Sequence, residues 1–200
     1  MRLVRPVAAL ALLAGCATSP ASSGPGVSTR AADFAPGQIR QPAVVVRLSL
    51  GPGSWSERER RQLPAAYEGA LLEALDARAV ITRDLRSGPD APADDAAALA
   101  RARVLGADHV ILIAVRVDRE PQRFCTAGRR PFETVATVWR QQARVLRAAD
   151  GAQRLGAGPL TVSDVDADCE DPRASRRRSP DETAADAVSR LLERLLDSPR

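Results

Sequence analysis

The 200-residue chain has no lysine, a single histidine, three cysteines and only 3% aromatic residues. With so few aromatic side chains, it has almost no material for stacking nucleic-acid bases or sugars. It also contains no P-loop, no G-x-G-x-x-G fingerprint and no G-x-S-x-G nucleophile motif. These absences argue against an enzyme. We therefore expect a protein with no catalytic residues, no metal and no cofactor.

Charge is close to balanced. The chain has 29 basic and 25 acidic residues, for a net charge of +4, and two of the bases, Arg2 and Arg5, lie in a leader that we expect to be removed. A chain so nearly neutral does not favour nucleic acid as a partner.

The N-terminus has the three parts of an export signal: the two arginines, a short apolar run over residues 7–14, and small residues before Cys16. The run is too short to span a bilayer, which takes about 20 apolar residues. Leu13-Ala14-Gly15-Cys16 resembles a bacterial lipobox, whose cysteine receives a diacylglycerol and becomes the new N-terminus. The alternative is an ordinary secretory signal with an incidental cysteine. Because Ala17 and not aspartate follows, the resemblance implies an anchor in the outer membrane, with the protein facing the periplasm.

Composition divides the chain into three segments. Residues 1–15 are the expected signal peptide, and residues 16–41 are the lipidated cysteine and a flexible tether rich in Ser, Pro, Gly and Ala. Residues 42–200 suffice for one periplasmic domain.

Hydrophobic patterns predict alternating strands and helices in this domain. We expect a strand at 43–50, a turn from Ser56 before a helix at 64–77, a strand at 78–84, a helix at 94–105 and a strand at 109–117. Two further strands, 134–148 and 152–162, are joined by the hairpin signal Asp150-Gly151. Ser179, Pro180 and Glu182 then begin a final helix. The prediction is an α/β domain of order β-α-β-α-β-β-β-α, with helices packed on a mixed sheet.

Two phrases, "LGADHVILIAVRV" at 105–117 and "ARVLRAADGAQRL" at 143–155, together with this order, resemble the curli-secretion lipoprotein family and the N-terminal domain of the translocation protein TolB. Other relatives of that fold activate penicillin-binding proteins or help to export polysaccharide. The resemblance covers most of residues 42–197. The two long membrane-inserting hairpins of the curli pore have no counterpart here, so it does not imply a transmembrane pore.

Cys125 and Cys169 are the cysteines that remain after the anchor, and export places them in an oxidising compartment. In the expected three-stranded meander, the loops that hold them emerge at the same edge of the sheet, which predicts a disulfide. The alternative is two free thiols, with or without a metal. His109 is expected to be buried in a strand, so a zinc site would lack ligands.

Charged residues gather at that edge. An acidic run, Asp164, Asp166, Asp168, Glu170 and Asp171, has the alternation of a calcium loop, but Cys169 stands at the required glycine, so a solvated loop is the simpler interpretation. Six arginines form a candidate interaction rim, with an ordinary solvated surface as the alternative: Arg123, Arg129, Arg130, Arg176, Arg177 and Arg178.

These expectations combine into a non-catalytic outer-membrane lipoprotein that serves as an accessory or assembly component of a secretion or transport machine of the cell envelope. Its partners would be the membrane, through the anchor, and unidentified envelope proteins. A homo-oligomer is left open. The alternatives are a regulator of a peptidoglycan synthase and, less favoured by the motifs, a periplasmic enzyme.

Overall fold

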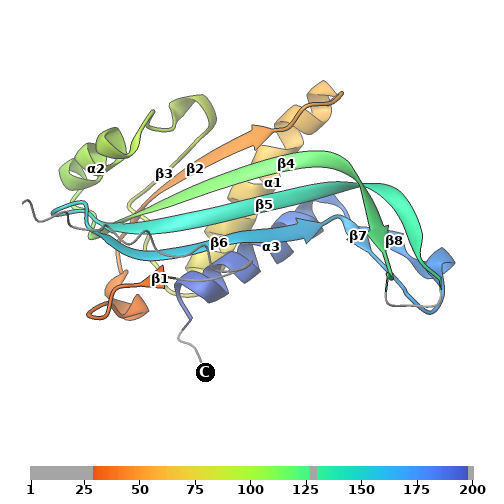
Figure 1. Ribbon diagram of the computed structural model, residues 1–200. Coiled ribbons are helices and arrows are strands. Elements are labelled where there is room, and N and C mark those ends of the chain that lie inside the picture. The colour runs from red at the N-terminus through yellow and green to blue at the C-terminus, as the bar shows by residue number, and fades with distance from the viewer. Residues whose placement is uncertain (1–28, 127–129, 198–200) are drawn as a thin grey trace, which may run out of the picture.

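The order of helices and strands is the one that the sequence predicts, with three short strands added. The computed structural model describes residues 29–126 and 130–197 (Figure 1). The elements are β1 (Thr29–Arg30), β2 (Ala43–Leu50), α1 (Glu57–Asp76), β3 (Asp84–Ser87), α2 (Asp95–Val104), β4 (His109–Phe124), β5 (Phe132–Arg147), β6 (Gln153–Ser163), β7 (Val165–Asp166), β8 (Arg176–Arg177) and α3 (Pro180–Leu195). Short 3-10 turns lie at Pro36–Gln38, Gly88–Asp90 and Pro172–Ala174.

Six strands form a mixed sheet in the order β1-β6-β5-β4-β2-β3. Strand β2 runs parallel to β3 and β4, while β4, β5 and β6 form an antiparallel meander. Helices α1 and α3 cover one face side by side, and α2 covers one end of the other face (Figure 1). Strands β7 and β8 form a separate two-stranded ribbon. The predicted fold class, an α/β domain with helices packed on a mixed sheet, is confirmed.

The alternation of side chains along β4 divides the core between these two layers. Ile111 and Ile113 pack under α1 and α3, whereas Val110 and Leu112 pack under α2. Because both faces are covered here, residues 110–113 of the strand are apolar without interruption.

Helix α1 begins earlier than predicted. The sequence indicates a separate turn before Pro64, but one helix runs from Glu57, with Ser56 and Glu59 forming a capping box. Pro64 lies inside this helix and cannot donate a hydrogen bond to the preceding turn. Leu63 and Tyr67 on either side of it are buried, so packing and the cap outweigh the local cost.

The second strand lies further along the chain than predicted. Residues 78–83 close the end of α1 and do not form a strand: Ala79 has a positive φ of 54°, and the amide of Val80 donates to Leu75. The β-branched residues there predict a buried strand, but Ile81 is 64% exposed. Pairing with β2 starts only at Asp84.

Part of the predicted tether belongs to the domain. Strand β1 pairs with β6, and Phe34 and Ile39 are buried in the main core. The carboxylate of Asp108 accepts hydrogen bonds from the backbone of Arg40 and Gln41. Phe34 and Ile39 stand alone in a segment that is otherwise rich in Ser, Pro, Gly and Ala, and such a composition indicates a tether. Composition therefore places the start of the domain too late.

One buried polar link joins both helices to the sheet. The hydroxyl of Tyr67 on α1 donates to Oε1 of Gln141 on β5 at 2.6 Å, and the amide nitrogen of Gln141 donates to the carbonyl of Ala187 on α3. Both side chains are buried, and burial raises the pKa of the Tyr67 hydroxyl well above its usual value. The tyrosine therefore stays neutral and remains the donor.

We expect Tyr67→Phe to lower the free energy of unfolding by about 1–3 kcal/mol, because the Gln141 oxygen would stay buried without a donor. Gln141→Leu should also destabilise the protein. The double variant should lose less than the sum of the two single losses, because the removed groups are partners. Urea denaturation of the four proteins measures this coupling, and strictly additive losses would contradict the link.

Candidate functional site

The long hairpin β4–β5 extends beyond the helices as an arm. The strand predicted to end at Val117 continues to Phe124, and pairing with β5 is unbroken from His109↔Arg147 to Phe124↔Phe132. We call the outer part, residues 118–124 and 132–138, the arm. Figure 1 shows it curving toward the β7–β8 ribbon.

A disulfide ties the arm to this ribbon. Cys125 follows the last residue of β4, and Cys169 lies in the connection between β7 and β8, with 5.2 Å between the two Cα atoms. The rings of Phe124 and Phe132 stack next to the disulfide at a centroid distance of 5.4 Å. The tip of the arm is therefore covalently attached to the segment that leads into α3.

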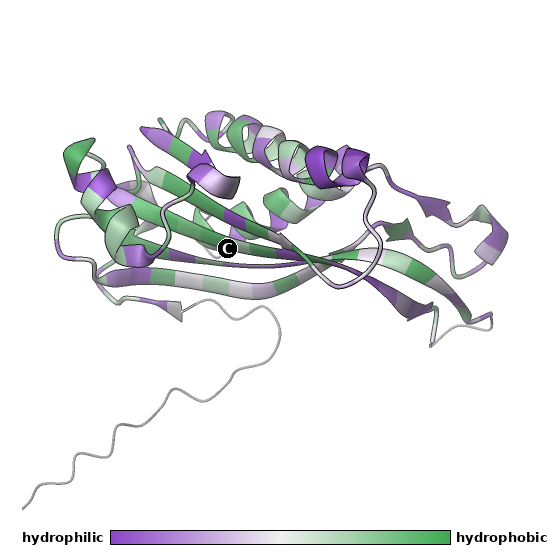
Figure 2. Ribbon diagram, turned by 90° about the horizontal axis from the view of Figure 1, so that it is seen from above, coloured by the Kyte–Doolittle hydropathy of each residue, from purple (hydrophilic) through white to green (hydrophobic). Residues whose placement is uncertain are grey.

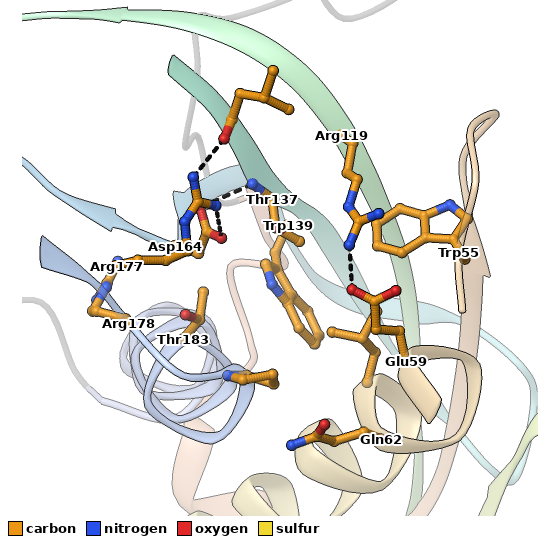
Figure 3. Close-up of a pocket in the computed structure, with 13 residues that line it drawn as sticks. Trp55, Glu59, Gln62, Arg119, Thr137, Trp139, Asp164, Arg177, Arg178 and Thr183 are labelled. Atoms are coloured by element: carbon orange, nitrogen blue, oxygen red, sulfur yellow. Dashed lines mark hydrogen bonds and ion pairs between the residues drawn. The ribbon is translucent and has the colours of Figure 1, made fainter. Parts of the chain in front are cut away.

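A cleft of about 230 Å³ lies at the base of the arm, beside the first turns of α1 and α3 (Figure 3). Trp139 and Leu63 supply apolar surface, and charged side chains surround it. The lining residues are Trp55, Glu59, Gln62, Leu63, Arg119, Val135, Thr137, Trp139, Asp164, Arg177, Arg178, Pro180 and Thr183.

One wall of the cleft is a stack of Trp55 and Arg119. The indole N–H of Trp55 donates to the carbonyl of Gly51 at 2.9 Å, and the Arg119 guanidinium lies 4.6 Å from the ring centroid. Arg119 also donates to the carbonyl of Ser54 and pairs with Glu59. The indole and the guanidinium thus hold each other in place.

Glu59 connects this wall to the start of α1. Hydrogen bonds from the Ser56 hydroxyl and backbone, followed by the charge of Arg119, hold the pKa of its carboxyl below the usual value. The same carboxylate thus caps the helix and fixes the arginine.

The opposite wall rests on a buried carboxylate, Asp164. Its oxygens accept from the amide of Thr137 at 2.9 Å and from Arg177 at 2.6 Å, while Arg177 also donates to the carbonyl of Val135. Next to it, Arg178 pairs with Asp186 at 2.7 Å and donates to the carbonyl of Ser163. Each guanidinium of the cleft is therefore positioned by a carboxylate.

The structure separates the predicted arginine rim into two groups. Arg177 and Arg178 line the cleft, and Arg176 pairs with Asp166 and Glu182. Arg123 and Arg130 are exposed near the end of the arm, where Arg123 lies 3.9 Å from Glu133. Arg129 and the expected lipidation site Cys16 lie outside the described residues.

Two carboxylates of the acidic run hold neighbouring parts of the chain in place through hydrogen bonds. Asp168 accepts hydrogen bonds from the backbone of Glu170 and Asp171, and Asp164 is used within the cleft. No group of three or more His, Cys, Asp or Glu side chains that could hold a metal occurs in residues 29–126 and 130–197.

His109 lies at the other end of the molecule from the cleft. It is buried at the start of β4, with its ring 5.6 Å from that of Phe34. Ten strand residues separate it from Arg119, which corresponds to roughly 33 Å. His109 does not line the cleft.

Sequence reasoning did not identify the cleft. The sequence pattern places Trp139 in the core and gives Glu59 the spacing of a capping box with Ser56, but it assigns no role to Trp55. One signal was available: side chains 111, 113, 115 and 117 face the α1–α3 layer, so continued alternation puts Arg119 on this same face. The position of Trp55 beside it depends on the turn after β2, which no periodicity specifies.

The fold and the cleft define a mixed α/β domain with a disulfide-linked arm. Within the described part of the chain, no helix has the length and apolar character needed to cross a bilayer. No protein-family model matches the sequence, and no curated protein matches it.

Solved structures with similarity to this chain come from several bacteria. The PelC dodecamer from Paraburkholderia phytofirmans is 17% identical, with 87% of this chain and 98% of that chain covered and a TM-score of 0.47. Lipoprotein GNA1162 from Neisseria meningitidis is 13% identical over 78% and 100% of the two chains, with a TM-score of 0.41. Protein XCC0632 from Xanthomonas campestris is 11% identical over 84% and 89%, with a TM-score of 0.39. At these values the likeness assigns neither a family nor a function, and the resemblance to curli-secretion proteins stays a prediction.

The depressed pKa of Glu59 predicts an acid-sensitive contribution to stability. A carboxyl whose pKa is lower in the folded state stabilises fully above its ordinary value of 4.5, and this contribution is lost as the pH falls. Glu59→Gln should therefore lower the free energy of unfolding by roughly 1 kcal/mol at neutral pH, with a difference that shrinks below about pH 4. Urea denaturation across this range measures it, with the more exposed Glu57→Gln as control. A difference independent of pH would contradict the assignment.

Removing the disulfide should loosen the arm first. The bond closes a loop of sequence separation 44, and the chain-entropy relation gives about 4 kcal/mol for such a loop. In Cys125→Ser/Cys169→Ser we expect faster amide hydrogen exchange in residues 118–124 and 165–177, with residues 109–117 of β4 protected as before. Equal acceleration in both halves of β4 would show that the arm is not a separate unit.

Proposed function

We propose that this protein is an exported lipoprotein, anchored by Cys16 in the outer membrane, whose domain acts in the periplasm by binding another component of the cell envelope. The observation that carries the proposal is Leu13-Ala14-Gly15-Cys16 directly after a short apolar run. The Cys125–Cys169 disulfide supports it, because such bonds persist in oxidising compartments.

The arrangement of the cleft supports binding as the mode of action. Its charged side chains are engaged in hydrogen bonds and ion pairs that fix their positions, as the Glu59–Arg119 and Asp164–Arg177 pairs show. Fixed donors around an apolar floor suit recognition of a ligand. The role that we propose is therefore an accessory or assembly component of a secretion or transport machine.

The length of the tether argues against the alternative role as a regulator of a peptidoglycan synthase in the inner membrane. Because residues 29–41 belong to the domain, only residues 17–28 separate the anchor from β1. A fully extended chain of that length spans at most about 45 Å, roughly half of what a tether ending at residue 41 would span.

We expect Cys16→Ser to move the protein from the membrane fraction to the soluble fraction and to abolish incorporation of labelled palmitate. The physical reason is loss of the acyl chains, each buried CH₂ of which contributes about 0.8 kcal/mol to membrane binding. The matched control is Cys125→Ser/Cys169→Ser, which removes the other two cysteines and should stay in the membrane fraction. Retention of the Cys16→Ser protein in the membrane would overturn the anchor.

A further inference from the structure

We propose that the cleft between Trp55 and Arg178 binds the C-terminal residue of a partner polypeptide, with its apolar side chain against Trp139 and its carboxylate toward the arginines. The inference rests on the proposed binding function and names the chemistry of the ligand.

The size and floor of the cleft suit one amino-acid residue. Its volume of about 230 Å³ is below the roughly 300–1,000 Å³ typical of pockets for larger ligands. Leu63, Trp139 and Pro180 provide apolar surface, and Val135 at the margin is 54% exposed. A single apolar side chain would cover this surface and remove it from water.

An unpaired donor marks where the ligand needs an acceptor. Trp139 lines the cleft, and Figure 3 draws no hydrogen bond from its indole nitrogen to another lining residue. Buried tryptophans usually satisfy this group, as Trp55 does with the carbonyl of Gly51. The buried donor of this cleft that lacks a partner among the described residues is the Nε of Arg178. An acceptor supplied by a ligand would match this donor, and the indole N–H of Trp139 offers a second donor to the same ligand.

The guanidinium donors around the cleft suit an anionic acceptor, because hydrogen bonds between charged groups are the stronger ones. Three guanidiniums lie around it: Arg119 comes from β4, Arg177 from β8, and Arg178 directly follows β8. Helices α1 and α3 both begin there, and the N-termini of helices carry partial positive charge. Each guanidinium is paired with one carboxylate, Arg119 with Glu59, Arg177 with Asp164 and Arg178 with Asp186. A guanidinium has five N–H groups, more than one such pair uses, so donors remain for a ligand.

A C-terminal residue combines the two required groups on one scaffold. Its carboxylate is the anionic acceptor, and its side chain is attached to the adjacent carbon, within the reach of a cleft this small. An inorganic anion lacks the apolar part, and an internal residue lacks the carboxylate. This comparison identifies the probes: N-acetyl-leucine as the ligand mimic, N-acetyl-leucinamide without the charge, and inorganic phosphate without the side chain.

The two tryptophans make the test direct, because they are the only ones in the chain and both line the cleft. The full mature protein, extracted in mild detergent and labelled with ¹⁵N at the tryptophan indoles, should give two N–H signals by NMR. We expect N-acetyl-leucine to shift the Trp139 signal downfield in a saturable way. The Trp55 N–H, which is already bonded to Gly51, should shift less. The amide should bind at least about tenfold more weakly, because it lacks the charge-assisted hydrogen bonds.

Matched variants separate recognition from folding. Arg119→Gln should weaken N-acetyl-leucine about fivefold or more. Arg116→Gln, on the opposite face of the same strand, should leave binding unchanged. Trp139→Phe assigns the indole signal and should weaken binding, with its fold checked by circular dichroism. The proposal is overturned by an absence of saturable shift, by equal affinity for acid and amide, by an equal effect of phosphate, or by equal losses in both arginine variants. None of these results would alter the outcome of the Cys16→Ser localisation test, so the two proposals can fail separately.

Discussion

The β4–β5 ladder is the constraint on which the rest of the structure depends. Sixteen consecutive pairs join the two strands without a bulge, from the buried half of the sheet to the tip of the arm. From Val110 to Ile113, helices cover both faces and the strand is apolar. Over the second half the helices have ended, and the same alternation presents Arg119 and Thr137 to the cleft. The cleft exists because the strands are longer than the layer of helices that covers them.

Two kinds of connection make the arm and the helical layer one unit. The Tyr67–Gln141–Ala187 link ties α1, β5 and α3 together inside the core. Further out, the disulfide ties the tip of the arm to the β7–β8 ribbon, and Asp164 at the start of that ribbon bonds to Thr137 on the arm. The walls of the cleft come from these separate elements, so its shape depends on both connections. A binding site assembled in this way is sensitive to the geometry of the arm as well as to its own lining.

Elements with strong local signals could be predicted from the sequence. The capping box at Ser179, the Asp150-Gly151 turn and the apolar run from His109 place α3, the β5–β6 hairpin and β4 to within a few residues, apart from the extension of β4. Predictions failed where local chemistry competed with packing. Pro64 is an unfavourable residue for a helix interior, yet α1 passes through it because the flanking side chains are buried. Phe34 and Ile39 are lone apolar residues in a segment of low complexity, so their burial could not be anticipated from composition.

By itself, the sequence determined the strand and helix order and the shared edge of Cys125 and Cys169, and it predicts an export signal with its cysteine, because periodicity, capping and short motifs act over a few residues. Only the tertiary structure decided that the hairpin continues as an arm, that the chain before Pro42 closes over the sheet, and that Trp55 stacks on Arg119. Trp139 shows the difference most clearly: its apolar strand predicts burial, but only the positions of α1 and α3 leave its indole N–H at the floor of a cleft. Those positions depend on contacts between residues far apart in the chain, about which local patterns carry no information.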